Sequence, residues 1–290
     1  MSDSRPAAAK PGAIHTIHDA ARAARDEGPL RFDDVDEAIA ERVVDALRPY
    51  VSEARQQRIE SALASRTQAV SVVLEDVHSE HNAAAVLRSA DAMGLLEAHL
   101  IPRTTGFRVS RKVSIGAHKW LDVRAYPGPE QAYAALRARG VEVWASAIRG
   151  QNVPVAEIPI DRPTALVFGN EHEGLSSAAI DMADGRFHIP MTGFVESLNI
   201  SVAAAITMYD VTRRRREAGQ WVGLSEATTR RLRAAWYALS VRAASMILAQ
   251  AGLPLPLMTP RPLSMQERRS EPCPDPEHPT MGSSASESMP

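Results

Sequence analysis

Ile189-Pro-Met-Thr-Gly-Phe-Val-Glu-Ser-Leu-Asn-Ile-Ser-Val-Ala-Ala-Ala-Ile206 is the most informative segment of this sequence. After a Pro and a Gly it carries the polar residues Ser197, Asn199 and Ser201, and it ends in an apolar run typical of a helix. Ser and Asn at a helix start either cap free N–H groups or present hydroxyl and amide groups to a ligand. Taken alone, the stretch favours an ordinary capped core helix. Two earlier stretches of the same character change that interpretation.

Composition places the chain among ordinary globular proteins. Its 290 residues are 44% apolar, enough for one or two domains with a buried core. The net charge of −2 does not indicate a nucleic-acid binder, although arginines gather at 213–216 and 230–233. The single Cys273 excludes a disulfide framework and a cysteine-based metal site. With no bilayer-length apolar run and no signal-peptide segment at the N-terminus, we expect a cytoplasmic protein.

Short β-branched runs alternate with helical patterns through the middle of the chain. Strands are expected at 70–74, 98–101, 121–125, 141–146, 165–168 and 187–189, and helices at 83–93, 129–140 and 176–183 and from 199 onward. A strand, a polar loop, a helix and a strand within about thirty residues is typical of a parallel sheet with crossover helices. The fold class is therefore α/β, with a Rossmann-like parallel sheet.

Helical segments flank this middle part. Residues 33–66 have apolar side chains at four-residue spacing with a break near Pro49, and 225–251 predicts one amphipathic helix. Arg55, Arg58 and Arg66 either belong to a solvated helix face or face RNA. Residues 1 to about 30 and the Pro-, Ser- and Glu-rich tail from 259 are expected to be disordered.

Polar loops follow three of the predicted strands, where open α/β sheets bind ligands. The first leads to Asn82, placed to cap a helix, and to Arg88 within it. Unpaired burial of an arginine is costly, so Arg88 reaches solvent or meets a phosphate or carboxylate. The second loop, Gly169-Asn-Glu-His-Glu-Gly174, has glycines that allow close approach of a ligand to the backbone. The third is the stretch quoted above.

The amino-acid sequences of the three loops, taken together and in this order, are a more specific signal than any one loop. Asn82-x5-Arg88-x-Ala-Asp-Ala-x-Gly94, Gly169-Asn-Glu-x-x-Gly174-Leu-Ser and Ile189-Pro-Met-x-Gly-x-x-x-Ser197-Leu-Asn199-x-Ser201-x-Ala together resemble the three motifs of the SpoU/TrmH family. These are SPOUT-class, trefoil-knotted RNA ribose 2′-O-methyltransferases. The resemblance runs from about Arg55 to Pro256. It includes 74–82, 114–120 and 252–256, and is strongest to the branch that methylates guanosine 18 in the tRNA D-loop.

The resemblance implies a C-terminal trefoil knot, S-adenosylmethionine as cofactor, tRNA as substrate, a homodimer and no metal or membrane partner. The implied cofactor contacts are Ser146, Gly169, Ile189, Met191 and Leu198. The implied catalytic residues are Arg88, Asn82, Glu171, Ser197 and Asn199. The implied RNA contacts are Arg55, Arg58, Arg213, Arg214, Arg215 and Arg216. Each set also has an alternative interpretation. Ile189, Met191 and Leu198 could simply be core residues, Glu171 could be a solvated acid in a loop, and the arginines at 213–216 could form a solvated helix end.

On this basis the chain divides into four parts: 1–50, a partly disordered N-terminal extension; 51–215, the SPOUT domain with a leading helix; 216–258, a helical RNA-binding flank; and 259–290, a disordered tail. In the family, the arginine matching Arg88 is proposed to activate the ribose 2′-OH. A guanidinium has a pKa above about 12, and a neighbouring phosphate raises it further. We therefore hypothesise that Arg88 holds the ribose-phosphate and stabilises the developing alkoxide, acting as base only if desolvated.

Three other functions remain as alternatives. In two of them the enzyme methylates ribosomal RNA or another position of tRNA. In the third the chain is a non-catalytic RNA-binding factor on the same fold. The joint presence of Asn82, Arg88, Ser197 and Asn199 speaks against a silent copy. A nucleotide hydrolase is disfavoured because neither a Walker lysine nor a pair of metal-binding carboxylates is found in the sequence.

Overall fold

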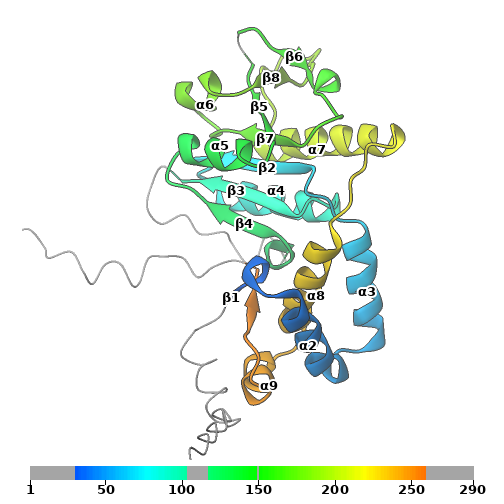
Figure 1. Ribbon diagram of the computed structural model, residues 1–290. Helices are drawn as coiled ribbons and strands as arrows, with labels where there is room; N and C mark the ends of the chain where they lie inside the picture. Colours follow the sequence, from blue (N-terminus) through cyan, green and yellow to red (C-terminus); the bar gives the residue numbers. More distant parts are fainter. Residues whose placement is uncertain (1–29, 103–116, 149, 259–290) are drawn as a thin grey trace, which may run out of the picture. The chain divides into compact units, whose positions relative to one another are not determined.

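A parallel sheet forms the centre of the computed structural model, which describes residues 30–102, 117–148 and 150–258 (Figure 1). The strand order is β4-β3-β2-β7-β5-β8-β6, and every neighbouring pair is parallel. The strands are β2 (Val70–Glu75), β3 (Glu97–Ile101), β4 (Asp122–Ala125), β5 (Glu142–Ser146), β6 (Val153–Pro154), β7 (Thr164–Phe168) and β8 (Gly185–His188). The predicted α/β class with a parallel sheet is confirmed, and the sequence missed only the short β6 within this sheet.

Helices cover both faces of the sheet. On one face α4 (Glu80–Ala92) and α7 (Ile200–Glu217) share a core with Val72 and Leu74 of β2. On the other face α5 (Pro129–Arg137) and α6 (Ser177–Asp181) share a core with Val73, the residue between them. This alternation follows from the two-residue period of a strand, which turns neighbouring side chains to opposite faces. No helix in the described ranges is long and apolar enough to cross a membrane.

A third core joins segments from the two ends of the described chain. It is formed by a 3₁₀ turn (Phe32–Asp34), α2 (Glu37–Leu47), α3 (Glu53–Ala64), α8 (Glu226–Ser240) and α9 (Ala244–Gln250). β1 (Leu30–Arg31) pairs with β9 (Pro256–Leu257) beside it. The boundary predicted at residue 50 therefore separates segments whose side chains pack in one core. The predicted disordered segments and motif residues 114–116 lie outside the described residues.

Two helical predictions meet different outcomes. The break near Pro49 is confirmed, since a 3₁₀ turn (Arg48–Tyr50) separates α2 from α3. A single helix over 225–251 is wrong, because Val241 adopts an extended backbone and α9 begins only at Ala244. β-branched Val241 loses little by leaving the helix, because its side chain is restricted there.

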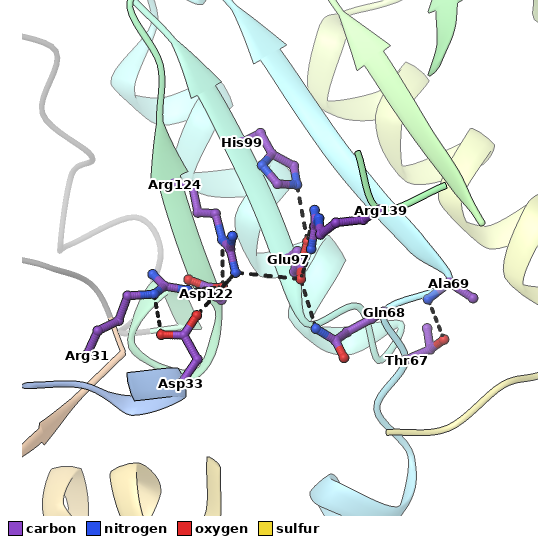
Figure 2. A network of polar contacts seen from close by, with 10 residues as sticks. All are labelled: Arg31, Asp33, Thr67, Gln68, Ala69, Glu97, His99, Asp122, Arg124 and Arg139. Carbon is purple, nitrogen blue, oxygen red and sulfur yellow. Dashed lines mark hydrogen bonds and ion pairs between the residues drawn. The ribbon is translucent and has the colours of Figure 1, made fainter. Parts of the chain in front are cut away.

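Buried charges tie the first strand to the sheet (Figure 2). Glu97 and Asp122 begin β3 and β4 and are 1% and 0% exposed. Arg139 donates two hydrogen bonds to Glu97, at 2.7 and 2.8 Å. Asp122 accepts hydrogen bonds from Arg31 at 2.6 Å and from Arg124 at 2.9 Å. Because these groups lie at the amino ends of the strands, they are at the opposite edge of the sheet from the predicted ligand loops.

Candidate active site

Asn82 lies in the first turn of α4, on the loop that leaves β2. The sequence-based prediction that Asn82 caps this helix is wrong, because Ser79 is the cap. The Ser79 hydroxyl accepts a hydrogen bond from the Asn82 backbone N–H at 3.2 Å. A serine three residues upstream satisfies the orphan N–H as well as an asparagine does. The side-chain amide of Asn82 is consequently available for contacts with the other two loops.

The three predicted loops meet at this amide. Asn82 Nδ2 donates to Glu171 Oε1 at 2.8 Å, and Asn199 Nδ2 donates to Asn82 Oδ1 at 3.3 Å. Asn199 in turn caps α7, as its Oδ1 accepts the N–H of Ser201 at 2.8 Å and its hydroxyl at 2.6 Å. From Asn199 through Asn82, each side-chain amide donates toward Glu171. The carboxyl ends of β2, β7 and β8 are therefore joined by one hydrogen-bond chain.

Glu171 ends that chain as an ionised acceptor. Partial burial by itself raises the pKa of the carboxyl group, but hydrogen bonds outweigh it and lower the pKa below the usual value. They come from the Asn82 side chain and from the backbone N–H groups of Glu171, His78 and Ser79. A carboxylate with a lowered pKa is a weak base at neutral pH. Glu171 is thus suited to orient Asn82 and unsuited to remove a proton from a hydroxyl.

Arg88 lies six residues beyond Asn82 on α4 and is exposed. Among the residues that the structure describes, no hydrogen-bond acceptor or carboxylate is paired with it. Glu171 does not pair with Arg88 in the structure, because it accepts from the Asn82 side chain and from the backbone N–H of His78. Arg88 therefore presents a solvated cation next to the joined loops, available to an anionic ligand.

A cleft of about 400 Å³ opens beside the ends of β5 and β8. Four of the five residues predicted to contact a cofactor line it, namely Ser146, Ile189, Met191 and Leu198, and Ser197 lines it as well. The other lining residues are Ala147, Ile148, His188, Pro190, Val195 and Ala203. Sequence motifs did not indicate His188 or Ile148, although their positions at strand ends were a usable signal.

Gly169 packs against the backbone of its own loop. It does not line the cleft. A Cβ at Gly169 would lie 2.3 Å from the backbone of Gly174 and Leu175, so no side chain fits there. Gly174 itself has a φ of +73°, in the left-handed region that favours glycine. The two glycines close the loop that presents Glu171, and the predicted cofactor contact of Gly169 stays a prediction.

The four consecutive arginines near the end of α7 lie in different environments. Arg215 is 2% exposed and donates to Thr164 Oγ1 at 3.1 Å, so its predicted RNA contact is wrong. Arg214 donates to the backbone carbonyls of Ile158 and Val155 at 2.9 and 3.0 Å, and to Asp210. Arg213 pairs with Asp210 and Glu217, and Arg216 stacks 3.8 Å from the Trp221 ring centroid. A helix turns each successive residue by about 100°, so only part of such a run faces solvent.

The two arginines predicted on α3 are exposed. Arg55 lies with its guanidinium carbon 5.1 Å from the ring centroid of Trp120, and Arg58 follows three residues later on the same helix. Residues three apart on a helix are surface neighbours, so both cations are presented together. In the described part of the chain, no group of three His, Cys, Asp or Glu side chains is placed to hold a metal ion.

Comparisons with known proteins match this arrangement. The SpoU rRNA Methylase family matches residues 69–209. The tRNA (guanosine(18)-2′-O)-methyltransferase of Thermus thermophilus is 43% identical over 168 residues, covering 58% of this chain and 87% of that protein. The protein of the same name from Escherichia coli is 35% identical over 182 residues, covering 61% and 80%.

Among solved structures, the Aquifex aeolicus TrmH/SpoU tRNA modifying enzyme has a TM-score of 0.60 at 31% identity, covering 64% of this chain and 95% of that chain. The family match includes all three loops that converge on Asn82. The chain belongs to the SpoU/TrmH methylase family.

Proposed function

We propose that this protein transfers the methyl group of S-adenosylmethionine to the ribose 2′-OH of guanosine 18 in tRNA. The observation that carries the proposal is the hydrogen-bond chain Asn199–Asn82–Glu171 beside an exposed Arg88 that is unpaired among the described residues. The relatives with 43% and 35% identity carry the corresponding name, which supports guanosine 18 as the target. The proposed reaction takes place in the cytoplasm, where the substrate is found.

The residues of the cleft suit this cofactor. Its volume of about 400 Å³ lies within the range of about 300–1,000 Å³ typical of small-molecule sites. Apolar Ile189, Met191 and Leu198 suit an adenine ring, and Ser146 and Ser197 add hydroxyl groups. When bound, S-adenosylmethionine supplies a methyl group already activated by its sulfonium centre. No metal ion is needed for that activation.

Arg88 acts on the ribose and its phosphate. Its guanidinium is exposed to water and does not lie in an apolar pocket, which supports an electrostatic role over that of a base. A fixed cation beside the 2′-oxygen stabilises the negative charge that develops there during transfer. Asn82 and Asn199 hold the loops around that oxygen, and Glu171 holds Asn82. Positioning of this kind can supply several kcal/mol of the barrier reduction.

We further propose that the segment between β8 and α7 is threaded as a trefoil knot. Buried Ala204 at the start of α7 supports it, since a small side chain allows a threaded backbone to pass closely. The close approach of Gly169 to Gly174 shortens the loop that such a segment would pass. An experimental density trace of residues 140–217 tests the threading, and an unthreaded path there would refute it.

Arginines that reach the surface form the proposed tRNA contacts. These are Arg55 and Arg58 on α3, and Arg213 and Arg216 near the end of α7. Each phosphate contact releases bound counterions, so affinity for tRNA should fall steeply with salt. Arg214 and Arg215 are left out because their guanidinium groups are used by the protein's own carbonyl and hydroxyl oxygens.

The decisive experiment is transfer of labelled methyl from S-adenosylmethionine to a tRNA transcript, compared with the same transcript carrying 2′-deoxyguanosine at position 18. We expect label in the first and none in the second, because the acceptor oxygen is missing. Label in both transcripts would move the target to another nucleotide. Label only in ribosomal RNA would favour that substrate, and cofactor binding without transfer to any RNA would favour a binding factor.

We also propose that a second copy of the chain covers an apolar stripe on α7. Val202, Ile206 and Tyr209 are 46%, 40% and 59% exposed and lie four and three residues apart on one side of the helix. Phe194 and Val195, in the loop before α7, are also exposed. Exposed apolar patches of this kind mark protein interfaces, and a stripe on one helix can pair with itself about a two-fold axis.

Sedimentation equilibrium tests the dimer. The wild type is expected at about twice the chain mass of 31.5 kDa, and Ile206→Asp at the chain mass. A buried charge opposes association because it loses hydration without a partner. Met246→Asp, at an exposed methionine of α9, is the matched control and should remain dimeric. A monomeric wild type, or an Ile206→Asp variant that still dimerises, would contradict this interface.

A further inference from the structure

Arg66 lies between the active-site helix and the helical core. It is 3% exposed, unlike Arg55 and Arg58 with which the sequence groups it. Its Nη1 donates to the carbonyl oxygen of Leu95 at 2.6 Å and to that of Asp91 at 3.3 Å. Its Nη2 donates to the Asp91 carboxylate in a close ion pair. An RNA-facing role is therefore excluded by burial, and these polar contacts all go to the end of α4 and the residues just after it.

Asp91 has two possible cationic partners, and the structure shows it with only one. It lies three residues beyond Arg88 on α4, so the two side chains are neighbours on the helix surface. Its side chain is 29% exposed, so its carboxylate is within reach of a solvated arginine. In the structure the carboxylate is paired with Arg66, and Arg88 has no carboxylate partner among the described residues. Arg66 is thus paired with Asp91, the acidic residue nearest to Arg88 along α4.

Trp236 of α8 holds Arg66 in this position. The guanidinium carbon lies 5.2 Å from the Trp236 ring centroid, and the ring is 1% exposed. Trp236 also meets Trp120 edge-on at 5.6 Å. A guanidinium group on a buried aromatic face is favoured by cation–π attraction and has little freedom to move away. The contacts from Asp91 through Arg66 to Trp236 therefore connect α4 to the helical core through side chains that have little freedom to move.

We propose that Arg66 is a positioning residue for methyl transfer. It fixes the last turn of α4, and it keeps the Asp91 carboxylate from capturing Arg88. This inference rests on the proposed function, in which Arg88 must be free to meet the ribose-phosphate. The role is specific to arginine. Its planar guanidinium group lies on an aromatic face and at the same time donates to two carbonyl oxygens and a carboxylate, and the ammonium group of a lysine has no such plane.

The test measures single-turnover methyl transfer to tRNA at saturating cofactor and tRNA for four proteins: wild type, Arg66→Met, Asp91→Asn, and the double variant. Arg66→Met should be at least about tenfold slower, because small displacements of a catalytic group reduce rates strongly. Asp91→Asn should stay within about twofold of wild type, because an amide oxygen still accepts from Arg66. The double variant should regain about two- to fivefold over Arg66→Met, the range for one surface ion pair removed.

Several results would overturn the inference. A double variant as slow as or slower than Arg66→Met would show that Asp91 does not compete for Arg88. Wild-type rate in Arg66→Met with only a lower melting temperature would show a purely structural role. Arg139→Met, which removes a guanidinium–carboxylate pair away from α4, is the control and should lower the melting temperature without changing the rate. Absence of transfer by the wild-type protein would instead refute the proposed function.

Discussion

Arg88→Ala is expected to slow methyl transfer by about 10²–10³-fold, the usual loss when one group that stabilises a developing oxyanion is removed. The side chain is exposed, and it has no protein partner within the described residues, so its removal should leave folding intact. Arg88 is not among the residues that line the cleft, so affinity for S-adenosylmethionine should be unchanged. The loss should therefore appear in the rate of the bound complex and in tRNA affinity.

Single-turnover transfer and calorimetric cofactor binding separate these effects. Arg42→Ala removes another exposed arginine, on α2, and should change the rate less than about twofold as a surface substitution. Arg88→Lys keeps the charge but loses the fork of donors, and should recover only part of the rate. Loss of cofactor binding in Arg88→Ala would contradict both the electrostatic role and a role as base.

Glu97→Leu is expected to lower the free energy of unfolding at pH 7 by about 3–5 kcal/mol, the cost of breaking a buried ion pair on one side. Arg139 loses both of its hydrogen bonds to Glu97, and the side-chain amide of Gln68 loses the acceptor to which it donates at 2.9 Å (Figure 2). His99, whose Nε2 lies 3.4 Å from Glu97, is fully buried and cannot turn to water. Urea unfolding measures the loss, and Glu157→Leu at an exposed site should cost less than about 0.5 kcal/mol.

The contribution of Glu97 should also depend on pH. Burial by itself raises the pKa of Glu97, but the neighbouring His99 and the hydrogen bonds and charge of Arg139 lower it well below its usual range. A lowered folded-state pKa stabilises the fold above the unfolded-state pKa of about 4.3. The stability difference between wild type and Glu97→Leu should be full above about pH 5 and shrink as the pH falls below it. A difference that stays constant down to about pH 3 would contradict this account.

Local chemistry made the active site predictable. Asn82, Glu171 and Asn199 lie on three loops far apart in the chain, yet each loop directly follows a strand of a parallel sheet. Because such strands end at one edge, their loops converge whatever the length of chain between them. The same rule explains why Ser146 and Ile189 line one cleft. These placements follow from the order of strands and loops, which hydrophobic patterning reveals.

Sequence patterns were enough to predict the parallel α/β sheet, the helix start at Asn199 and the convergence of the motif loops, because each of these depends on local patterns. They could not show which arginines are free. Arg66 and Arg215 are buried against backbone carbonyls, whereas Arg55 and Arg88 reach solvent. An arginine has the same local pattern in either setting. Its environment is set by segments distant in sequence, such as α8 beside Arg66, and their packing cannot be deduced from the neighbouring residues.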